Sequence, residues 1–255
     1  MKKIILFSFA IIFILVSCGK GQQTETIIYT EGEETELTLD SIMSDTTKIL
    51  VAGLPIGFNH IDILMHPIGF CSLYDYDYYE KKVSSRSGKY IGDRISIVQC
   101  NDSNTFSGNL TNLIFEEPNT DKPQRKLTDK VLNITQIKYL RTFAKKINRH
   151  YILYNLQDKD TNRDGILDNK DIETLYLSNL DGTDFRKITP ENQNLNAIQF
   201  EPWYNRLYFI TIEDNNKDGK FDKRDKYHYF YIDFTNPDYK IIEYNPLSYI
   251  SINNQ

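Results

Sequence analysis

The chain has few of the residues that carry common catalytic and redox chemistry. Its 255 residues include 3 Cys, 4 His and 1 Trp, and no two cysteines stand in a CxxC spacing. HExxH, GxSxG and GxGxxG are also missing, which excludes the familiar zinc-peptidase, hydrolase and dinucleotide motifs. The histidines have no sequence neighbours that suggest a triad or a metal cluster: His60, His66, His150 and His228. The sequence therefore predicts a protein that is not an enzyme.

The chain also has no excess of positive charge. Thirty Lys and Arg stand against 35 Asp and Glu, so the formal net charge is −5. Nucleic-acid recognition starts from a basic surface, and we expect no nucleic-acid partner. Apolar residues make up 40% of the chain and charged residues 25%, as in a globular domain, and the 18 Tyr and 14 Phe favour sheet over helix.

One long apolar run is present, and it lies at the N-terminus. Lys2 and Lys3 precede apolar residues 4–16, a segment too short to span a bilayer comfortably. The run ends in Leu-Val-Ser-Cys at residues 15–18, which resembles a bacterial lipobox. The resemblance implies that residues 1–17 are a lipoprotein signal peptide and that Cys18 carries the lipid. It implies a lipid anchor in the cell envelope, at the outer membrane, with the periplasmic or surface face left open. An ordinary secretory signal or membrane anchor is the alternative.

Composition divides the rest of the chain in two. Residues 18–45 are rich in Gly, Gln, Thr and Glu, which predicts a flexible tether because such a segment buries little apolar surface. Residues 46–255 are predicted to form the folded domain. Cys71 and Cys100 lie in this domain, and both a disulfide and a pair of buried free thiols stay open.

The second half of the chain repeats itself. The motif Asp-x-Asn-x-Asp-Gly-x-x-Asp-x-x-Asp starts at Asp160 and again 54 residues later at Asp214, and the register continues from residues 175–177 to 229–231. A weaker third copy keeps only the segments after the motif, at 113–115 and 125–128. One structural unit is therefore used more than once.

The acidic motif predicts a calcium site. Calcium takes oxygen ligands from positions 1, 3, 5, 7, 9 and 12 of such a loop, with Gly at position 6. The predicted ligands of the first loop are Asp160, Asn162, Asp164, the carbonyl of Ile166, Asp168 and Asp171. Those of the second loop are Asp214, Asn216, Asp218, the carbonyl of Lys220, Asp222 and Asp225. Asp at position 12 resembles the loops of dockerins and other extracellular modules, which implies weak affinity; polar turns without calcium are the alternative.

The residues around these loops predict strands rather than the helices of an EF-hand. Segments 151–154, 207–212 and 227–232 are short and rich in β-branched and aromatic residues. We therefore expect calcium in β-hairpin loops. Only residues 137–147 have apolar residues at helical spacing.

Residues 175–189 resemble a blade of the TolB-like, WD40-type β-propellers, through an Asp-Gly turn and a following Arg-Lys-Ile-Thr step. The resemblance implies an all-β, propeller-like fold of about four units with calcium-loop hairpins. An incomplete propeller and a curled two-sheet sandwich stay open. The whole chain is also similar to calcium-loop lipoproteins of Bacteroidetes-type bacteria, a likeness that implies location and fold but no activity.

These features together predict a lipid-anchored, calcium-binding envelope protein that binds or scaffolds a protein or a glycan. An envelope glycan-active hydrolase with a site that the sequence does not reveal is one alternative. A purely structural or calcium-sensing component is another. The alternating tyrosines of residues 74–79 fit either sugar stacking or sheet packing.

Overall fold

The computed structural model describes residues 37–38, 47–72, 97–236 and 238–250. The signal peptide, Cys18, nearly all of the tether and residues 74–79 lie outside the described residues. Among the described residues, no helix is both long enough and apolar enough to cross a membrane.

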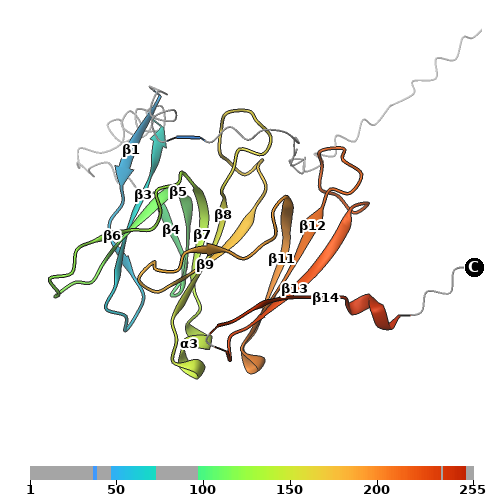
Figure 1. The fold of residues 1–255 in the computed structure, drawn as a ribbon. Coiled ribbons are helices and arrows are strands. Elements are labelled where there is room, and N and C mark those ends of the chain that lie inside the picture. Colours follow the sequence, from blue (N-terminus) through green and yellow to red (C-terminus); the bar gives the residue numbers. More distant parts are fainter. Residues whose placement is uncertain (1–36, 39–46, 73–96, 237, 251–255) are drawn as a thin grey trace, which may run out of the picture.

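The described strands form three antiparallel meanders (Figure 1). The first contains β1 (Lys48–Ala52), β3 (Leu64–Ser72), β5 (Thr105–Glu116) and β6 (Arg125–Lys126), with short β2 (Ile56–Gly57) on β3 and β4 (Val98–Asp102) on β5. The second contains β7 (Asn133–Tyr139), β8 (Tyr151–Gln157), β9 (Thr174–Asn179) and β10 (Arg186–Lys187). The third contains β11 (Gln193–Glu201), β12 (Arg206–Glu213), β13 (Lys226–Asp233) and β14 (Ile241–Tyr244). The helix α3 (Arg141–Ile147) and the 3-10 turns η1 (Pro202–Tyr204) and η2 (Pro246–Tyr249) complete the described elements.

Strand β5 joins the first two meanders into one sheet of ten strands. Its residue Leu110 pairs with Gly69 of β3 and with Ile134 of β7, and the register shifts beside it on both edges. Both neighbours are antiparallel to β5, although β3 and β7 point to opposite ends of the molecule in Figure 1. The strand therefore bends sharply near Gly108, where a Cβ would overlap the carbonyl oxygen of Ile97.

The second meander is buried on both faces. Ile152, Tyr154 and Leu156 of β8 belong to a cluster shared with β3, β5 and β7. Tyr151 and Leu153 belong to another, shared with α3 and the third meander. Alternate residues of a strand point to opposite faces, so β8 packs against one apolar layer on each side. Nearly every residue of β8 is buried, which explains why its first four residues are all apolar or aromatic.

The prediction of a β fold is confirmed, since the described residues form two antiparallel sheets and one short α-helix. Tyr176 pairs with Lys187 in the second meander as Ile114 pairs with Lys126 in the first. The described residues form no propeller, and they hold three meanders rather than about four. The physical reason is the bent β5, which hydrogen-bonds two meanders together, whereas propeller blades are separate sheets around a channel.

Two smaller predictions need correction. The helical spacing of residues 137–147 gives a helix only from Arg141, because 137–139 are paired in β7. Of the two alternatives for Cys71 and Cys100, the structure has free thiols, but they are not buried, since Cys71 is half-buried and Cys100 is exposed.

We predict that Gly108→Ala lowers the free energy of unfolding by about 1–3 kcal/mol, because the new methyl group meets backbone that cannot rotate away. Urea denaturation measures this change. Gly57→Ala is the matched control, since its Cβ would lie 3.1 Å from the flexible Cδ2 of Leu64. Equal effects of the two substitutions would contradict the close approach at the bend.

Candidate metal centre

The two acidic loops lie at the same end of the molecule. The first, residues 160–171, connects β8 to β9, and the second, residues 214–225, connects β12 to β13. Figure 1 shows both above their hairpins, at the end where β1 begins. Lys48, the first residue of β1, and residues 165–169 of the first loop line one cavity of about 570 Å³. We call this the loop end of the molecule. The prediction of strand-flanked hairpin loops is confirmed.

The backbone takes the same course in both loops. Positions 4 and 6 have positive φ angles, 61° and 82° at Arg163 and Gly165, and 58° and 77° at Lys217 and Gly219. This region of φ favours glycine, which accounts for the Gly at position 6 in each copy. The equal spacing in the sequence therefore reflects an equal local fold.

The Asp at position 1 holds each loop together and leaves one oxygen over. Asp160 Oδ2 accepts a hydrogen bond from the Gly165 amide at 2.8 Å, and Asp214 Oδ2 accepts one from Gly219 at 2.8 Å. The other oxygen, Oδ1, is buried without a hydrogen-bond partner in both residues. A buried carboxylate oxygen without a partner is costly, and a cation is the simplest group that satisfies it.

Positions 3, 5 and 9 also offer oxygens. Each side-chain oxygen accepts the amide two residues ahead, at 2.8–3.0 Å, and the residues are Asn162, Asp164, Asp168, Asn216, Asp218 and Asp222. These short bonds set the direction of the side chains. A carboxylate or amide oxygen has a further lone pair beyond the one that accepts the amide.

The Asp at position 12 closes each loop from inside. Asp171 is fully buried and accepts the amides of Thr161 at 2.7 Å, Asn162 at 3.2 Å and Asp168 at 3.0 Å. Burial raises the pKa of Asp171, and these backbone amides oppose that rise. Asp225 is 6% exposed and accepts the Asp222 amide at 2.8 Å, but its Oδ1 is buried without a partner. The second loop therefore has two such oxygens, from Asp214 and Asp225.

The second loop contains its own counter-ion. Arg224 Nη2 lies 2.5 Å from Asp222 Oδ2 and 3.2 Å from Asp218 Oδ2. Hydrogen bonds from Arg224 lower the pKa of Asp222 to about 2. The first loop has only a longer pair, with Lys170 Nζ 3.7 Å from Asp168 Oδ2. A cation in the second loop would thus compete with Arg224.

Carboxylates alone do not complete a site. Within the described ranges, no three His, Cys, Asp or Glu side chains lie close enough together to hold a metal ion, so the structure does not bring together the four Asp side chains predicted as ligands in either loop. The predicted donor set also needs the Asn oxygen of position 3 and the carbonyl of position 7, which are suitable ligands for calcium. The donors are oxygens of the kind that calcium takes, and the partnerless Asp oxygens are the observation in each loop that points to a cation.

Three of the four histidines have structural partners, and none of the four is a predicted ligand. His66 Nε2 is 2.6 Å from Glu116, and His150 Nδ1 is 2.7 Å from the Tyr139 hydroxyl. His228 bridges Glu213 and Glu243, at 2.7 and 2.8 Å, across three neighbouring strands. Sequence reasoning missed this bridge, because its carboxylates lie 15 residues away on either side and meet His228 only through the pairing of β12, β13 and β14.

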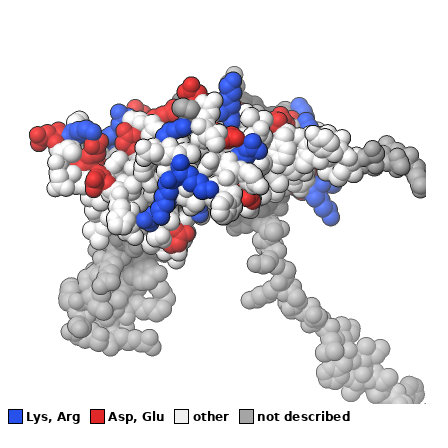
Figure 2. Space-filling model, turned by 90° about the horizontal axis from the view of Figure 1, so that it is seen from below, with Lys and Arg blue, Asp and Glu red and all other residues white. Residues whose placement is uncertain are grey.

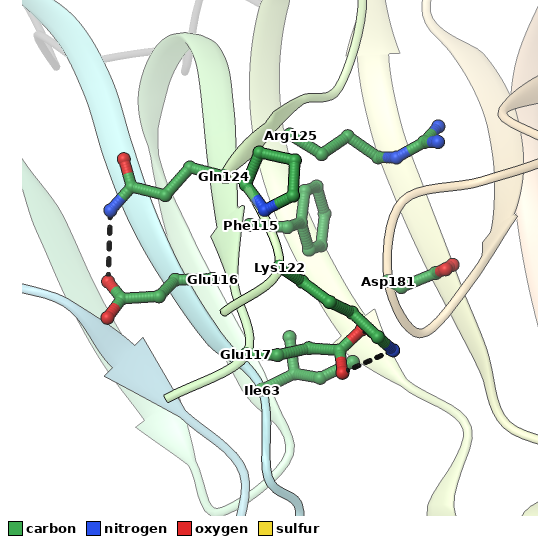
Figure 3. A pocket seen from close by; sticks show the side chains of 9 residues that line it. Ile63, Phe115, Glu116, Glu117, Lys122, Gln124, Arg125 and Asp181 are labelled. Carbon is green, nitrogen blue, oxygen red and sulfur yellow. Dashed lines mark hydrogen bonds and ion pairs between the residues drawn. The ribbon is translucent and has the colours of Figure 1, made fainter. Parts of the chain in front are cut away.

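A cavity of about 450 Å³ lies elsewhere, between β6 and the β9–β10 turn (Figure 3). Three of its charged groups have partners inside the chain: Lys122 Nζ lies 2.7 Å from Glu117, and Glu116 accepts a hydrogen bond from Gln124 at 3.2 Å. The cavity shows no convergent set of reactive side chains, and we assign it no chemistry.

A scan against protein-family models, a search of curated proteins and a search of solved structures each gave no match.

We predict that Asp171→Asn lowers the free energy of unfolding by about 1–3 kcal/mol in the presence of a chelator. The new amide group would face backbone N–H donors that now bind a carboxylate oxygen. Thermal or urea unfolding measures the loss. Asp164→Asn is the control, because Asp164 is exposed. If Asp171→Asn unfolds like the parent, Asp171 does not hold the loop closed.

Proposed function

We propose that the protein is a lipid-anchored envelope protein in which calcium stiffens two hairpins of a β-sheet module that binds or scaffolds a protein or glycan. One observation supports calcium above all: two loops that share the same acidic motif each bury an Asp Oδ1 that has no hydrogen-bond partner. A single buried carboxylate oxygen without a partner could be a local irregularity. The same oxygen without a partner at the same position of both loops suggests that both bind the same ligand.

The chain's own residues would hold the ion as the sequence predicts. The first set is Asp160, Asn162, Asp164, the Ile166 carbonyl, Asp168 and Asp171, and the second is Asp214, Asn216, Asp218, the Lys220 carbonyl, Asp222 and Asp225. Calcium would neutralise the crowded carboxylates and satisfy the buried oxygens. Rigid strands flank both loops, so no helix pair exists to open on binding, and a structural role fits better than a calmodulin-like switch.

We further propose that the meanders are related to propeller blades, arranged as an open stack. The second and third are four-stranded antiparallel units, the first adds two short strands to four, and the second packs its faces against the first and the third. Strand-connecting loops then gather at the two ends of the stack, where such modules commonly bind partners. This arrangement supports a binding or scaffold role.

Calcium should raise the melting temperature. Sites with Asp at position 12 should bind near the 10⁻⁴–10⁻³ M range of extracellular modules. At ten times Kd, each site adds about 1.4 kcal/mol by mass action. Asp160→Asn should remove the stabilisation by calcium at the first loop, and Asp214→Asn should remove that at the second loop. The two effects should be nearly additive because the loops belong to different meanders. Magnesium should do less, since it demands a tight octahedral shell.

The Arg224→Gln substitution distinguishes calcium binding at the second loop from calcium binding at the first. Removing the guanidinium frees Asp218 and Asp222, so calcium should bind this variant more tightly while the first loop is unchanged. Isothermal titration calorimetry measures both sites. No calcium uptake at millimolar concentration, or an unchanged calcium response in the Asp160→Asn/Asp214→Asn double variant, would sink the calcium proposal.

The lipid anchor is tested through Cys18. Cys18→Ala should abolish labelling by radioactive fatty acid and release the protein from a permanent lipid attachment, because the thiol is the acceptor that the lipobox resemblance implies. Cys100→Ala is the control and should label like the parent. A Cys18→Ala protein that still takes up fatty acid would contradict the lipoprotein assignment.

A further inference from the structure

A cluster of cations lies at the end of the molecule that holds α3, opposite the loop end. The chain as a whole is acidic, yet the 27 residues from 131 to 157 contain no Asp or Glu. The run contains five basic residues: Lys138, Arg141, Lys145, Lys146 and Arg149. None of the five forms an ion pair with a carboxylate of the described residues. Figure 2 looks onto this end, where blue side chains gather near the middle of the face.

Exposed aromatic rings stand beside these cations. Trp203, the only tryptophan, is 85% exposed, and its neighbour Tyr204 is 69% exposed. Lys146 Nζ donates to the Pro202 carbonyl at 2.6 Å and lies 4.7 Å from the centre of the Trp203 ring. The η1 turn is therefore held against α3 while its large rings face solvent. Two large exposed rings on one short turn are a typical feature of an interaction surface.

A cavity of about 320 Å³ opens between α3, the β4–β5 turn and η1. Lys138 and Arg141 line it, and Lys138 Nζ lies 5.0 Å from the centre of the Phe200 ring, which also lines it. Asn104 contributes a buried Oδ1 without a hydrogen-bond partner. The one carboxylate in the lining, Asp102, accepts the Asn104 amide at 2.7 Å. The cavity has the size of a small ligand site and combines two cations, an aromatic ring and an amide acceptor.

We propose that this α3 end binds an acidic glycan. Lys138 and Arg141 would bind the carboxylate, sulfate or phosphate groups of a sugar, since Lys and Arg suit such anions. The Asn104 oxygen would accept a sugar hydroxyl. The exposed faces of Trp203 and Tyr204 would pack against the C–H face of a neighbouring sugar ring. Lys145 and Arg149 would add long-range attraction for a polyanion.

The placement of this end favours a glycan over a lipid surface. The tether joins the folded domain where β1 begins, at the loop end, and Figure 1 shows α3 at the other end. A protein anchored through Cys18 would be attached at the loop end, which leaves the α3 end as the end farther from the point of attachment. This choice between glycan and lipid rests on the proposed anchor, whereas the attraction for an anion does not.

The experiment uses the mature chain, residues 18–255, made without its lipid, and follows the fluorescence of Trp203 as its only tryptophan. Polygalacturonate should give a saturable change that weakens as salt rises from 50 to 200 mM, while neutral dextran gives none. Arg141→Gln/Lys145→Gln should weaken binding about tenfold. Arg125→Gln/Lys130→Gln removes the same charge from exposed residues of the β6 region and should stay within about twofold. If the double variant does not fold, Lys145→Gln alone replaces it in the test, because Lys145 is exposed and its substitution should not disturb the fold.

Several outcomes would overturn the proposal. The first is that polygalacturonate does not bind, and the second is that the Arg141→Gln/Lys145→Gln variant binds it as well as the parent does. The third is that polyglutamate binds as tightly as polygalacturonate. The fourth is that phosphatidylglycerol vesicles bind more tightly than polygalacturonate and that the same variant loses this binding. The last two would assign the surface to an acidic peptide or to a membrane. Each titration is repeated with a chelator. The affinity for polygalacturonate should not change, because the α3 surface shares no residue with the loops. Failure of glycan binding therefore leaves the calcium proposal standing, and failure of calcium binding leaves the glycan proposal standing.

Discussion

Burial of the second meander on both faces is the constraint on which the rest of the structure depends. Leu153 and Tyr154 are neighbours on β8, yet they enter different apolar clusters and are 1% and 0% exposed. Burying each such side chain contributes about 1.5–3 kcal/mol, and both neighbouring meanders share in it. The faces of this sheet are therefore closed to ligands. Charged and polar chemistry is confined to the ends of its strands, which is where both candidate sites lie.

The two acidic loops balance their charge differently although their sequences repeat. Asp171 has a backbone amide for each of its oxygens, whereas Asp225 keeps one buried oxygen without a partner. The second loop places Arg224 against two of its carboxylates, whereas among the described residues the ion pair within the first loop, between Lys170 and Asp168, is longer. Hydrogen bonds from backbone amides to the buried Asp171 thus stabilise the first loop, and the exposed ion pairs of Arg224 stabilise the second. A cation meets a different competitor in each.

The sequence predicts features that depend on local spacing and misses those that depend on distant contacts. The hairpin loops, their glycines and the flanking strands follow from residues within one repeat, and the structure has them. The bend in β5 depends on the approach of Gly108 to Ile97, and the same bend joins two meanders that the repeat alone suggests are separate. The α3 surface was missed for a similar reason. Its cations are visible as an acid-free run, but only the fold brings Trp203 to Lys146.

The lengths of β8 and β12 also decide how the two ends influence one another. These strands have 7 and 8 residues, which corresponds to about 25 Å at the usual rise per residue. The Debye length in physiological salt is about 8 Å, so charges at one end are screened from charges at the other. Calcium at the loops would therefore leave the potential at α3 nearly unchanged. Any coupling between the ends would have to pass through the packing of the middle meander, whose close-packed side chains resist small displacements.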